Sequence, residues 1–198
     1  MTTIGFIRHG STEWNLLGKL QGQLDTDLTE EGREQARLLG LRLAGESWTG
    51  IISSDLRRAQ ETGMIVAEQS GIPFLGTDTR LRERRYGQAE GTTVAEREAR
   101  WGVDWKLLDI GQETDDELLA RWFEVEQELL RTHSNDRLLL ISHGGFIVQV
   151  LKGLQMNPDA FLQNTSLTIL LRKENGWELE LYNCLKHLNS ETSISTQG

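Results

Sequence analysis

Cysteine is almost missing from this sequence, which has only Cys184 among its 198 residues. A single cysteine cannot form an internal disulfide, and this fits a protein kept in a reducing compartment. Long apolar runs are missing as well. The first one, from about Ile4 to Ile7, is too short for a signal peptide or a membrane span and leads directly into charged residues. These absences predict a cytoplasmic protein with no membrane partner.

The sequence also has few prolines, no repeated or biased tract, and no excess of positive charge. Its formal net charge is −9, whereas a nucleic-acid-binding protein normally carries a basic surface, so no nucleic-acid partner is expected. Against this acidic background, arginines that converge on one site are informative. The length fits one domain over residues 1–198, with a loosely held tail from about residue 187, where Ser, Thr, Asn and Gln gather.

Motifs for several other chemistries are absent. The sequence has no HExxH and no short cluster of His and Cys, so a metal site has no recognisable ligand set. It has no GxSxG motif around a catalytic serine. Gly18-Lys19-Leu20 lacks the spacing and the hydroxyl residue of a Walker loop, and no GxGxxG follows a strand. We therefore expect neither a metal nor a cofactor.

Short apolar runs alternate with helical periodicity, which is typical of an α/β domain with a largely parallel sheet. Buried strands are predicted at residues 3–7, 50–53 and 137–141, with a further short strand near 73–75. Residues 167–171 and 177–182 alternate on either side of Asn175-Gly176, which predicts a hairpin that closes one edge of the sheet.

Helices are predicted between these strands. Thr29 suits an N-cap, since Glu30 and Glu31 follow it in the first turn, and Ala36, Leu39 and Leu43 then give an apolar face. Other helices are expected to begin near Ser54-Asp55, to run from Asp115 to about Thr132, and to follow Ser142-His143-Gly144-Gly145. The buried side of the long helix is assigned to Trp122, Phe123, Leu129 and Leu130.

Two of the four histidines occupy equivalent places, because His9 and His143 each follow a hydrophobic strand and precede a glycine. The carboxyl ends of parallel strands share one edge of a sheet, where ligand sites form, so these histidines are expected to meet. Arg8 lies beside the first, and either Arg57 or Arg58 would enter the same edge at a helix start. Guanidinium groups match the oxygens of a phosphate, which makes phosphate the expected ligand.

Each of these signals also has a plain structural reading. A histidine at a strand end is often a hydrogen-bonded structural residue, and paired arginines on a helix are usually solvated. The run Arg82-Glu83-Arg84-Arg85 suits either a surface or a site, and Trp101 and Trp105 would either cap a pocket or fill a core. The joint occurrence of His-Gly, His-Gly and Arg at three strand ends favours a site.

With these residues in place, the chain resembles the histidine phosphatase superfamily, also called the phosphoglycerate mutase-like family. The resemblance spans nearly the whole chain and rests on several ordered motifs. They are Phe6-Ile7-Arg8-His9-Gly10-Ser11-Thr12-Glu13-Trp14-Asn15, Gln21-Gly22, Leu28-Thr29-Glu30-Glu31-Gly32, Ser53-Ser54-Asp55-Leu56-Arg57-Arg58-Ala59, Leu81-Arg82-Glu83, Tyr86-Gly87-Gln88-Ala89-Glu90-Gly91, Ser142-His143-Gly144-Gly145 and Asn164-Thr165-Ser166. The family implies a three-layer αβα sandwich with a mostly parallel central sheet.

The resemblance also implies a role for each matched residue. His9 would be the nucleophile that forms a phosphohistidine, and Glu83 the proton donor. Arg8, Arg58 and His143 would hold the phosphoryl group, which selects Arg58 over Arg57. Asn15 would make a further phosphate contact and Gln21 a contact on the substrate side, while Gly22 and Gly144 belong to the binding loops. The chemistry needs no metal, because arginines supply the positive charge.

Within the family, phosphatases pass the phosphoryl group to water and mutases pass it to another hydroxyl. The residues after His9 and after Glu83 look more like the phosphatase branches, which implies a hydrolase for a small phosphorylated metabolite. The alternatives are a cofactor-dependent phosphoglycerate mutase and an inactive binding module with the same fold. Val148 and Gln149 replace basic residues of some branches, so a substrate with several phosphates is less attractive unless Arg82, Arg84 and Arg85 compensate. A homodimer is one option for the oligomeric state.

Overall fold

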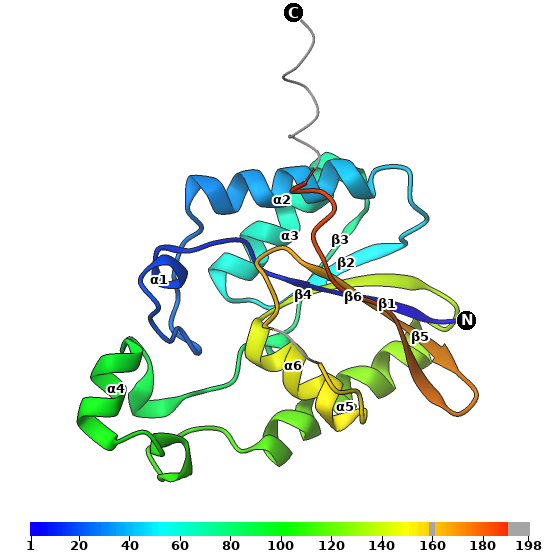
Figure 1. Cartoon of the computed structure of the whole chain (residues 1–198). Helices are drawn as coiled ribbons and strands as arrows, with labels where there is room; N and C mark the ends of the chain where they lie inside the picture. Colours follow the sequence, from blue (N-terminus) through cyan, green and yellow to red (C-terminus); the bar gives the residue numbers. More distant parts are fainter. Residues whose placement is uncertain (159–160, 190–198) are drawn as a thin grey trace, which may run out of the picture.

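The computed structural model describes residues 1–158 and 161–189 and is organised around one six-stranded sheet (Figure 1). The strands are β1 (Thr3–Arg8), β2 (Gly50–Ser53), β3 (Phe74–Thr77), β4 (Arg137–Ser142), β5 (Leu167–Lys173) and β6 (Gly176–Cys184). Their order is β3-β2-β4-β1-β5-β6. The first four of these run parallel, whereas β5 and β6 are antiparallel to their neighbours. The predicted mostly parallel sheet and its edge hairpin are therefore confirmed.

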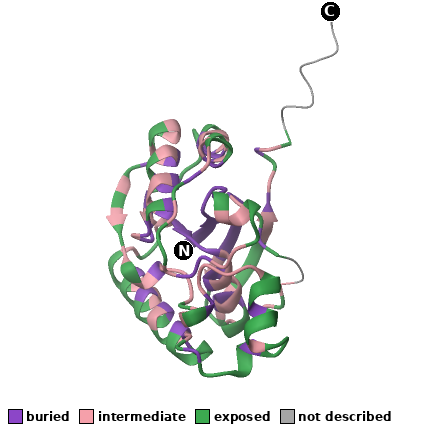
Figure 2. Ribbon diagram, turned by 90° about the vertical axis from the view of Figure 1, so that its left-hand side faces the viewer, coloured by how far each residue is buried: buried purple, intermediate pink, exposed green. Residues whose placement is uncertain are grey.

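Helices cover both faces of the sheet, so the predicted three layers are also confirmed. On one face lie α2 (Glu30–Leu43) and α3 (Arg57–Ser70), and on the other α5 (Asp115–Thr132) and α6 (Gly144–Gly153) (Figure 1). Successive side chains of a strand point to opposite faces. Phe6 and Leu140 therefore join the core beneath α5 and α6, while Ile7 and Ile141 join the core beneath α2 and α3. Figure 2 shows the buried residues gathered in the central strands.

The helix boundaries follow the capping residues where those are free to cap. Thr29 accepts a hydrogen bond from the Gly32 amide at the start of α2, as predicted. α3 begins at Arg57, two residues after the predicted Ser54-Asp55. The reason is that neither polar side chain caps this helix: Ser54 contacts His143, and Asp55 forms an ion pair with Arg82.

The buried side of α5 differs in part from the prediction. Trp122 and Leu129 are buried, but the Phe123 side chain is exposed, so its assignment to the core is wrong. The buried positions are Leu118, Trp122, Val125 and Leu129, which recur at three- and four-residue steps. Phe123 directly follows one of them and is rotated by about 100° around the helix, away from the sheet.

A smaller unit lies beyond the carboxyl ends of the parallel strands. It contains α1 (Glu13–Leu16), α4 (Val94–Trp101) and the short 3₁₀ helices η2 (Gly87–Ala89) and η3 (Trp105–Leu107). In Figure 1, α1 and α4 both lie on the side toward which β1 runs. This unit has its own small core of Ala89, Trp105 and Ile110, against which Trp101 packs. Both tryptophans thus contribute to a core, and Trp105 also lines a cleft beside Arg84.

The end of the described chain is better held than expected. His187 is buried, and its Nε2 lies 3.0 Å from the hydroxyl of Thr165. The predicted loose tail from about residue 187 is thus wrong at its first residue, and the rest of that prediction, at 190–198, lies outside the described residues. Within the described ranges, no helix has the length and apolar character needed to cross a membrane.

Candidate active site

The two histidines predicted to meet do so at the carboxyl ends of β1 and β4. Their ring centroids lie 5.2 Å apart, and both residues are buried. The sheet itself fixes this distance, because Arg8 pairs with Ser142 and the His9 amide then donates to the Ser142 carbonyl at 2.9 Å. The register of two neighbouring strands thus brings together residues that are 134 positions apart in the sequence.

One hydrogen bond determines which nitrogen of His9 is free to react. Nδ1 lies 2.7 Å from the carbonyl oxygen of Gly10. A carbonyl only accepts, so Nδ1 must carry the proton, and Nε2 keeps its lone pair. Burial lowers the pKa of His9 well below its usual value, and the charges of Arg58 and Arg8 lower it further. His9 is therefore neutral at pH 7, as a nucleophile must be.

The loop that carries His9 is fixed by neighbouring elements. The Gly10 amide donates to the Thr62 hydroxyl at 3.0 Å, and the Asn164 side chain donates to the His9 carbonyl at 2.8 Å. Gly10 lies so close to α2 that a Cβ there would come within 2.5 Å of the Gly32 carbonyl oxygen. These contacts hold the imidazole in place before a ligand arrives, which is what a positioned nucleophile requires.

Arg8 and Arg58 lie beside His9, and neither has a carboxylate partner among the described residues. Arg8 donates to the Leu162 carbonyl, and Arg58 donates to the carbonyls of Leu24 and Gly22. In the described part of the chain, the Nε of each is buried and has no hydrogen-bond partner. Burial lowers the pKa of each guanidinium to about 10, so both remain charged at pH 7. Two buried cations in this state form a strong site for an anion.

Arg57 has a different environment from its neighbour. Its side chain is 63% exposed and forms an ion pair with Asp27 at 3.2 Å, whereas Arg58 is fully buried and lines the cleft. The choice of Arg58 over Arg57 therefore agrees with their positions.

Arg58→Ala should lower kcat/KM for p-nitrophenyl phosphate by about 10²–10³-fold, because it removes one preorganised donor for the phosphoryl oxygens. Arg57→Ala is the matched control, and this exposed change should stay within about twofold. Steady-state kinetics on both variants provide the measurement. Equal losses in the two variants would contradict the assignment of Arg58.

His143 completes the group, and its ring is held by a hydrogen bond with Ser54. Its Nε2 lies 2.9 Å from the Ser54 hydroxyl oxygen, which accepts from the Leu56 amide at 3.3 Å. The hydroxyl hydrogen can then be donated to Nε2, which leaves the proton of His143 on Nδ1. Nδ1 is buried without a partner in the described residues. Burial, followed by the charge of Arg58, lowers the pKa of His143 well below its usual value. With the proton on Nδ1, the neutral ring can donate from that nitrogen.

Ser54→Ala should lower kcat/KM about tenfold, since the residue acts through the orientation of His143 and one hydrogen bond is lost. Ser53→Ala is the control, because the Ser53 hydroxyl donates to a backbone carbonyl and does not contact the imidazole. Nitrogen-15 chemical shifts of His143 should show mixed tautomers in the Ser54 variant and one tautomer in the control. Unchanged shifts in the Ser54 variant would contradict this positioning role.

Glu83 closes the opposite side of the cleft at the N-terminus of α6. One carboxylate oxygen accepts from the amides of Arg84 at 2.8 Å and Phe146 at 2.7 Å, and the other accepts from the Gly145 amide at 2.9 Å. A Cβ at Gly145 would lie 2.7 Å from the carboxylate and 2.5 Å from the Tyr86 hydroxyl. The glycine therefore allows Glu83 and Tyr86 to approach the helix start.

The arginines around Glu83 hold its segment in place through contacts outside the cleft that contains His9. Arg82 forms a two-pronged pair with Asp55, Arg84 pairs with Asp115, and Arg85 donates to a backbone carbonyl. Arg121 adds a contact to the Glu83 carbonyl at 3.3 Å. None of these arginines lines this cleft, but Arg84 lines a neighbouring cleft of about 420 Å³ together with Val148 and Gln149.

The cleft between these elements has a volume of about 400 Å³ and contains every other residue predicted to contact substrate. These residues are Asn15, Gln21, Gly22 and Gly144. Asn15 accepts from the Thr12 amide through its side-chain oxygen, and Gln21 accepts from the Thr26 hydroxyl, so the amide NH₂ group of each can face the cleft. Gly22 acts through its carbonyl, which orients Arg58.

Comparison with known proteins gives a family for this arrangement. The model of the histidine phosphatase superfamily (branch 1) matches residues 4–185. The chain belongs to the histidine phosphatase superfamily.

Relatives within the histidine phosphatase superfamily include enzymes named as phosphatases. An uncharacterized phosphatase, PhoE, of Bacillus subtilis is 32% identical, with 96% of this chain and 98% of that protein covered. The metal-independent phosphoserine phosphatase of Arabidopsis thaliana is 29% identical, with 96% and 84% covered. The solved structure of Bacillus stearothermophilus YhfR matches with a TM-score of 0.87 at 27% identity, covering 95% of this chain and all of that one.

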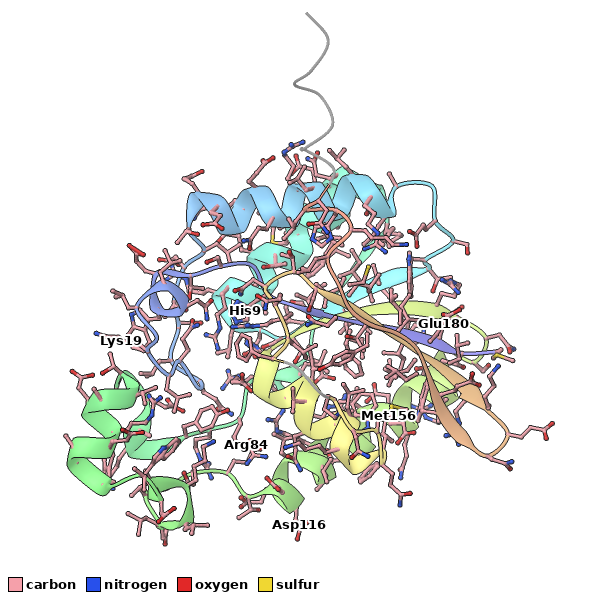
Figure 3. The ribbon with its side chains drawn as sticks, viewed as in Figure 1. His9, Lys19, Arg84, Asp116, Met156 and Glu180 are labelled. Carbon is pink, nitrogen blue, oxygen red and sulfur yellow. The ribbon has the colours of Figure 1, made fainter. Side chains whose placement is uncertain are left out.

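Several cleft residues of this member of the superfamily were not assigned a role from the sequence. They are Trp14, Lys19, Leu20, Tyr86, Arg97 and Phe161. Figure 3 shows His9 toward the middle of the molecule and Lys19 at the outer margin of the loop that follows α1. Tyr86 follows Glu83 by three residues, and this closeness is the one signal that could have found it. Arg97 gave no such signal. Among the described residues, no three His, Cys, Asp or Glu side chains gather as a metal site would require.

Proposed function

We propose that this chain is a phosphomonoester hydrolase that acts on a small phosphorylated metabolite through a phosphohistidine on His9. The observation that carries the proposal is the free Nε2 of His9. It shares one cleft with two buried guanidinium groups that have no carboxylate partner in residues 1–158 and 161–189. A tetrahedral dianion would supply the negative charge that these groups lack. Relatives named as phosphatases support the same class of reaction.

The proposed first step forms a bond between His9 Nε2 and phosphorus as the bond from phosphorus to the ester oxygen breaks. Arg8, Arg58 and the Nδ1–H of His143 hold the equatorial oxygens, where charge accumulates. Glu83 gives its proton to the departing oxygen. In the second step Glu83 takes a proton from water, the water oxygen bonds to phosphorus, and the nitrogen–phosphorus bond breaks to release phosphate.

The hydrogen bonds of Glu83 indicate which of its oxygens carries that proton. The oxygen bound by the Arg84 and Phe146 amides already accepts twice, whereas the oxygen bound by the Gly145 amide accepts once. Only the second has a lone pair left for a proton. We therefore assign the proton transfer to the oxygen bound by the Gly145 amide.

Hydrolysis of p-nitrophenyl phosphate tests the proposal directly. We expect turnover that EDTA does not reduce and that vanadate blocks, since arginines are proposed to supply the positive charge. Mass spectrometry after rapid denaturation should locate a phosphoryl group on His9. Absence of turnover would support the inactive binding module instead. Faster conversion of 3-phosphoglycerate to its isomer, in the presence of the bisphosphate primer, than hydrolysis would support the mutase.

A further inference from the structure

A third buried guanidinium, Arg97, lines the same cleft as His9 and has no place in the proposed chemistry. It comes from α4, in the small unit beyond the strand ends, and is 7% exposed. Its Nη1 donates to the Thr92 carbonyl at 2.5 Å, and its guanidinium lies over the Trp105 ring at 5.3 Å. Burial lowers the pKa of Arg97, but an arginine remains charged at neutral pH.

The edge of Arg97 formed by Nε and Nη2 has no partner among the described residues. Its Nε is buried without a hydrogen bond, and no carboxylate there lies within ion-pair distance. Elsewhere in this protein the same edge binds carboxylates with two hydrogen bonds. Arg82 binds Asp55 in this way at 2.7 and 2.5 Å, and Arg121 binds Glu113 at 2.7 and 3.0 Å.

A buried and unbonded Nε does not by itself make a site. Arg137 also has one and stacks on the Trp48 ring at 4.5 Å, but it lines no cleft with His9. Arg97 differs because it adds an independent observation, its place in the wall of the candidate active site. A buried charge needs a partner more than an exposed one does, and here the cleft is where a partner can come from.

Tyr86 connects Arg97 to the reacting end of the cleft. Its hydroxyl and the Glu83 carboxylate approach the same point beside Gly145, at 2.5 and 2.7 Å from a Cβ placed there. Burial raises the pKa of Tyr86, and the nearby charges of Arg84 and Arg97 act in the opposite direction. Glu83, Tyr86 and Arg97 thus line the same cleft, and Arg97 reaches it from α4.

We propose that Arg97 binds a carboxylate on the substrate while its phosphoryl group lies at His9. This inference rests on the proposed function and narrows its substrate class to small phosphomonoesters of hydroxy acids or amino acids. A single guanidinium edge with a hydroxyl nearby fits a singly charged carboxylate, since the phosphoryl end has two guanidinium and two imidazole groups. Lys19 also lines this cleft, and its ammonium group lies 5.7 Å from the centroid of the Trp14 ring.

The test compares two substrates with the same carbon skeleton, 3-phosphoglycerate, which has a carboxylate, and glycerol 3-phosphate, which has a hydroxymethyl group in its place. The ratio of their kcat/KM values should favour 3-phosphoglycerate in the unaltered protein. Arg97→Gln should lower this ratio by about 10- to 100-fold, as expected for hydrogen bonds to a charged group. Arg100→Gln, an exposed change on the same helix, should leave the ratio unchanged.

Arg97→Lys keeps the charge but lacks the two-pronged edge, so an intermediate ratio is expected, and this variant decides the test if Arg97→Gln does not fold. A ratio near one in the unaltered protein, or an unchanged ratio in both Arg97 variants, would overturn the inference while p-nitrophenyl phosphate is still hydrolysed. Loss of p-nitrophenyl phosphate turnover in the unaltered protein would overturn the proposed function instead. If the unaltered protein does not hydrolyse p-nitrophenyl phosphate, calorimetry would compare its affinities for 3-phosphoglycerate and glycerol 3-phosphate. Equal affinities would overturn the inference as well.

Discussion

His9→Ala should reduce kcat for p-nitrophenyl phosphate by about 10⁴-fold or more, because it removes the covalent route itself and leaves only binding and charge stabilisation. The phosphoryl group trapped after rapid denaturation should disappear in the same variant. His133→Ala is the matched control. That histidine pairs with Asp136 at 2.9 Å near the end of α5 and does not line the cleft. Near-normal turnover by the His9 variant would refute a mechanism through this residue.

The pH dependence of kcat/KM in the unaltered protein tests the protonation state of His9. Protonation of its Nε2 would remove the attacking lone pair, and the pKa of His9 lies well below 6.5 because the ring is buried among arginines. The nucleophile therefore stays neutral as the pH falls through 6.5, and no loss of kcat/KM with an apparent pKa of 6.5 is expected from His9.

In the unfolded chain both buried histidines take up a proton near pH 6.5. The free energy of unfolding should therefore fall as the pH drops below 6.5.

Prediction from the sequence succeeded where one local signal had one structural meaning. The apolar runs at β1 and β4 can only be buried strands in a sheet of this kind. The Thr29 hydroxyl accepts from the Gly32 amide as a cap while it donates to the Ser11 carbonyl, so its two contacts do not compete. Prediction failed where a tertiary contact engaged the side chain on which the local prediction rested. Ser54 and Asp55 look like a helix start, but His143 and Arg82 engage their side chains, and α3 begins later.

The same distinction separates the two halves of the cleft. His9, His143 and Arg58 follow strands, so parallel topology alone predicts that they meet. Arg97 lies on a short helix rich in charged residues, where Glu96 and Arg100 are exposed and only Arg97 turns inward. The direction of that helix depends on how Trp105 and Ile110 pack beneath it, which no local pattern specifies. Substrate preference is therefore harder to predict from this sequence than reaction type.

Glu83→Gln should lower kcat/KM by about 10²–10⁴-fold for an alkyl phosphate, whose alkoxide must be protonated as it leaves. The loss should be much smaller for p-nitrophenyl phosphate, because nitrophenolate leaves without a proton. The glutamine oxygen can still accept from Arg84 and Phe146, but its NH₂ group cannot accept from Gly145, so the melting temperature should be measured alongside.

Glu90→Gln is the control for that structural cost. The Glu90 carboxylate also accepts from backbone amides, those of Gln23 and Tyr86, but it does not line the cleft. Its loss should lower kcat/KM for both esters by the same factor, since it changes packing and leaves proton transfer intact. A Glu83 variant that slowed the alkyl and nitrophenyl esters equally would show that the carboxylate only supports α6. A difference that depends on the leaving group identifies the general acid, because only proton donation depends on the basicity of the departing oxygen.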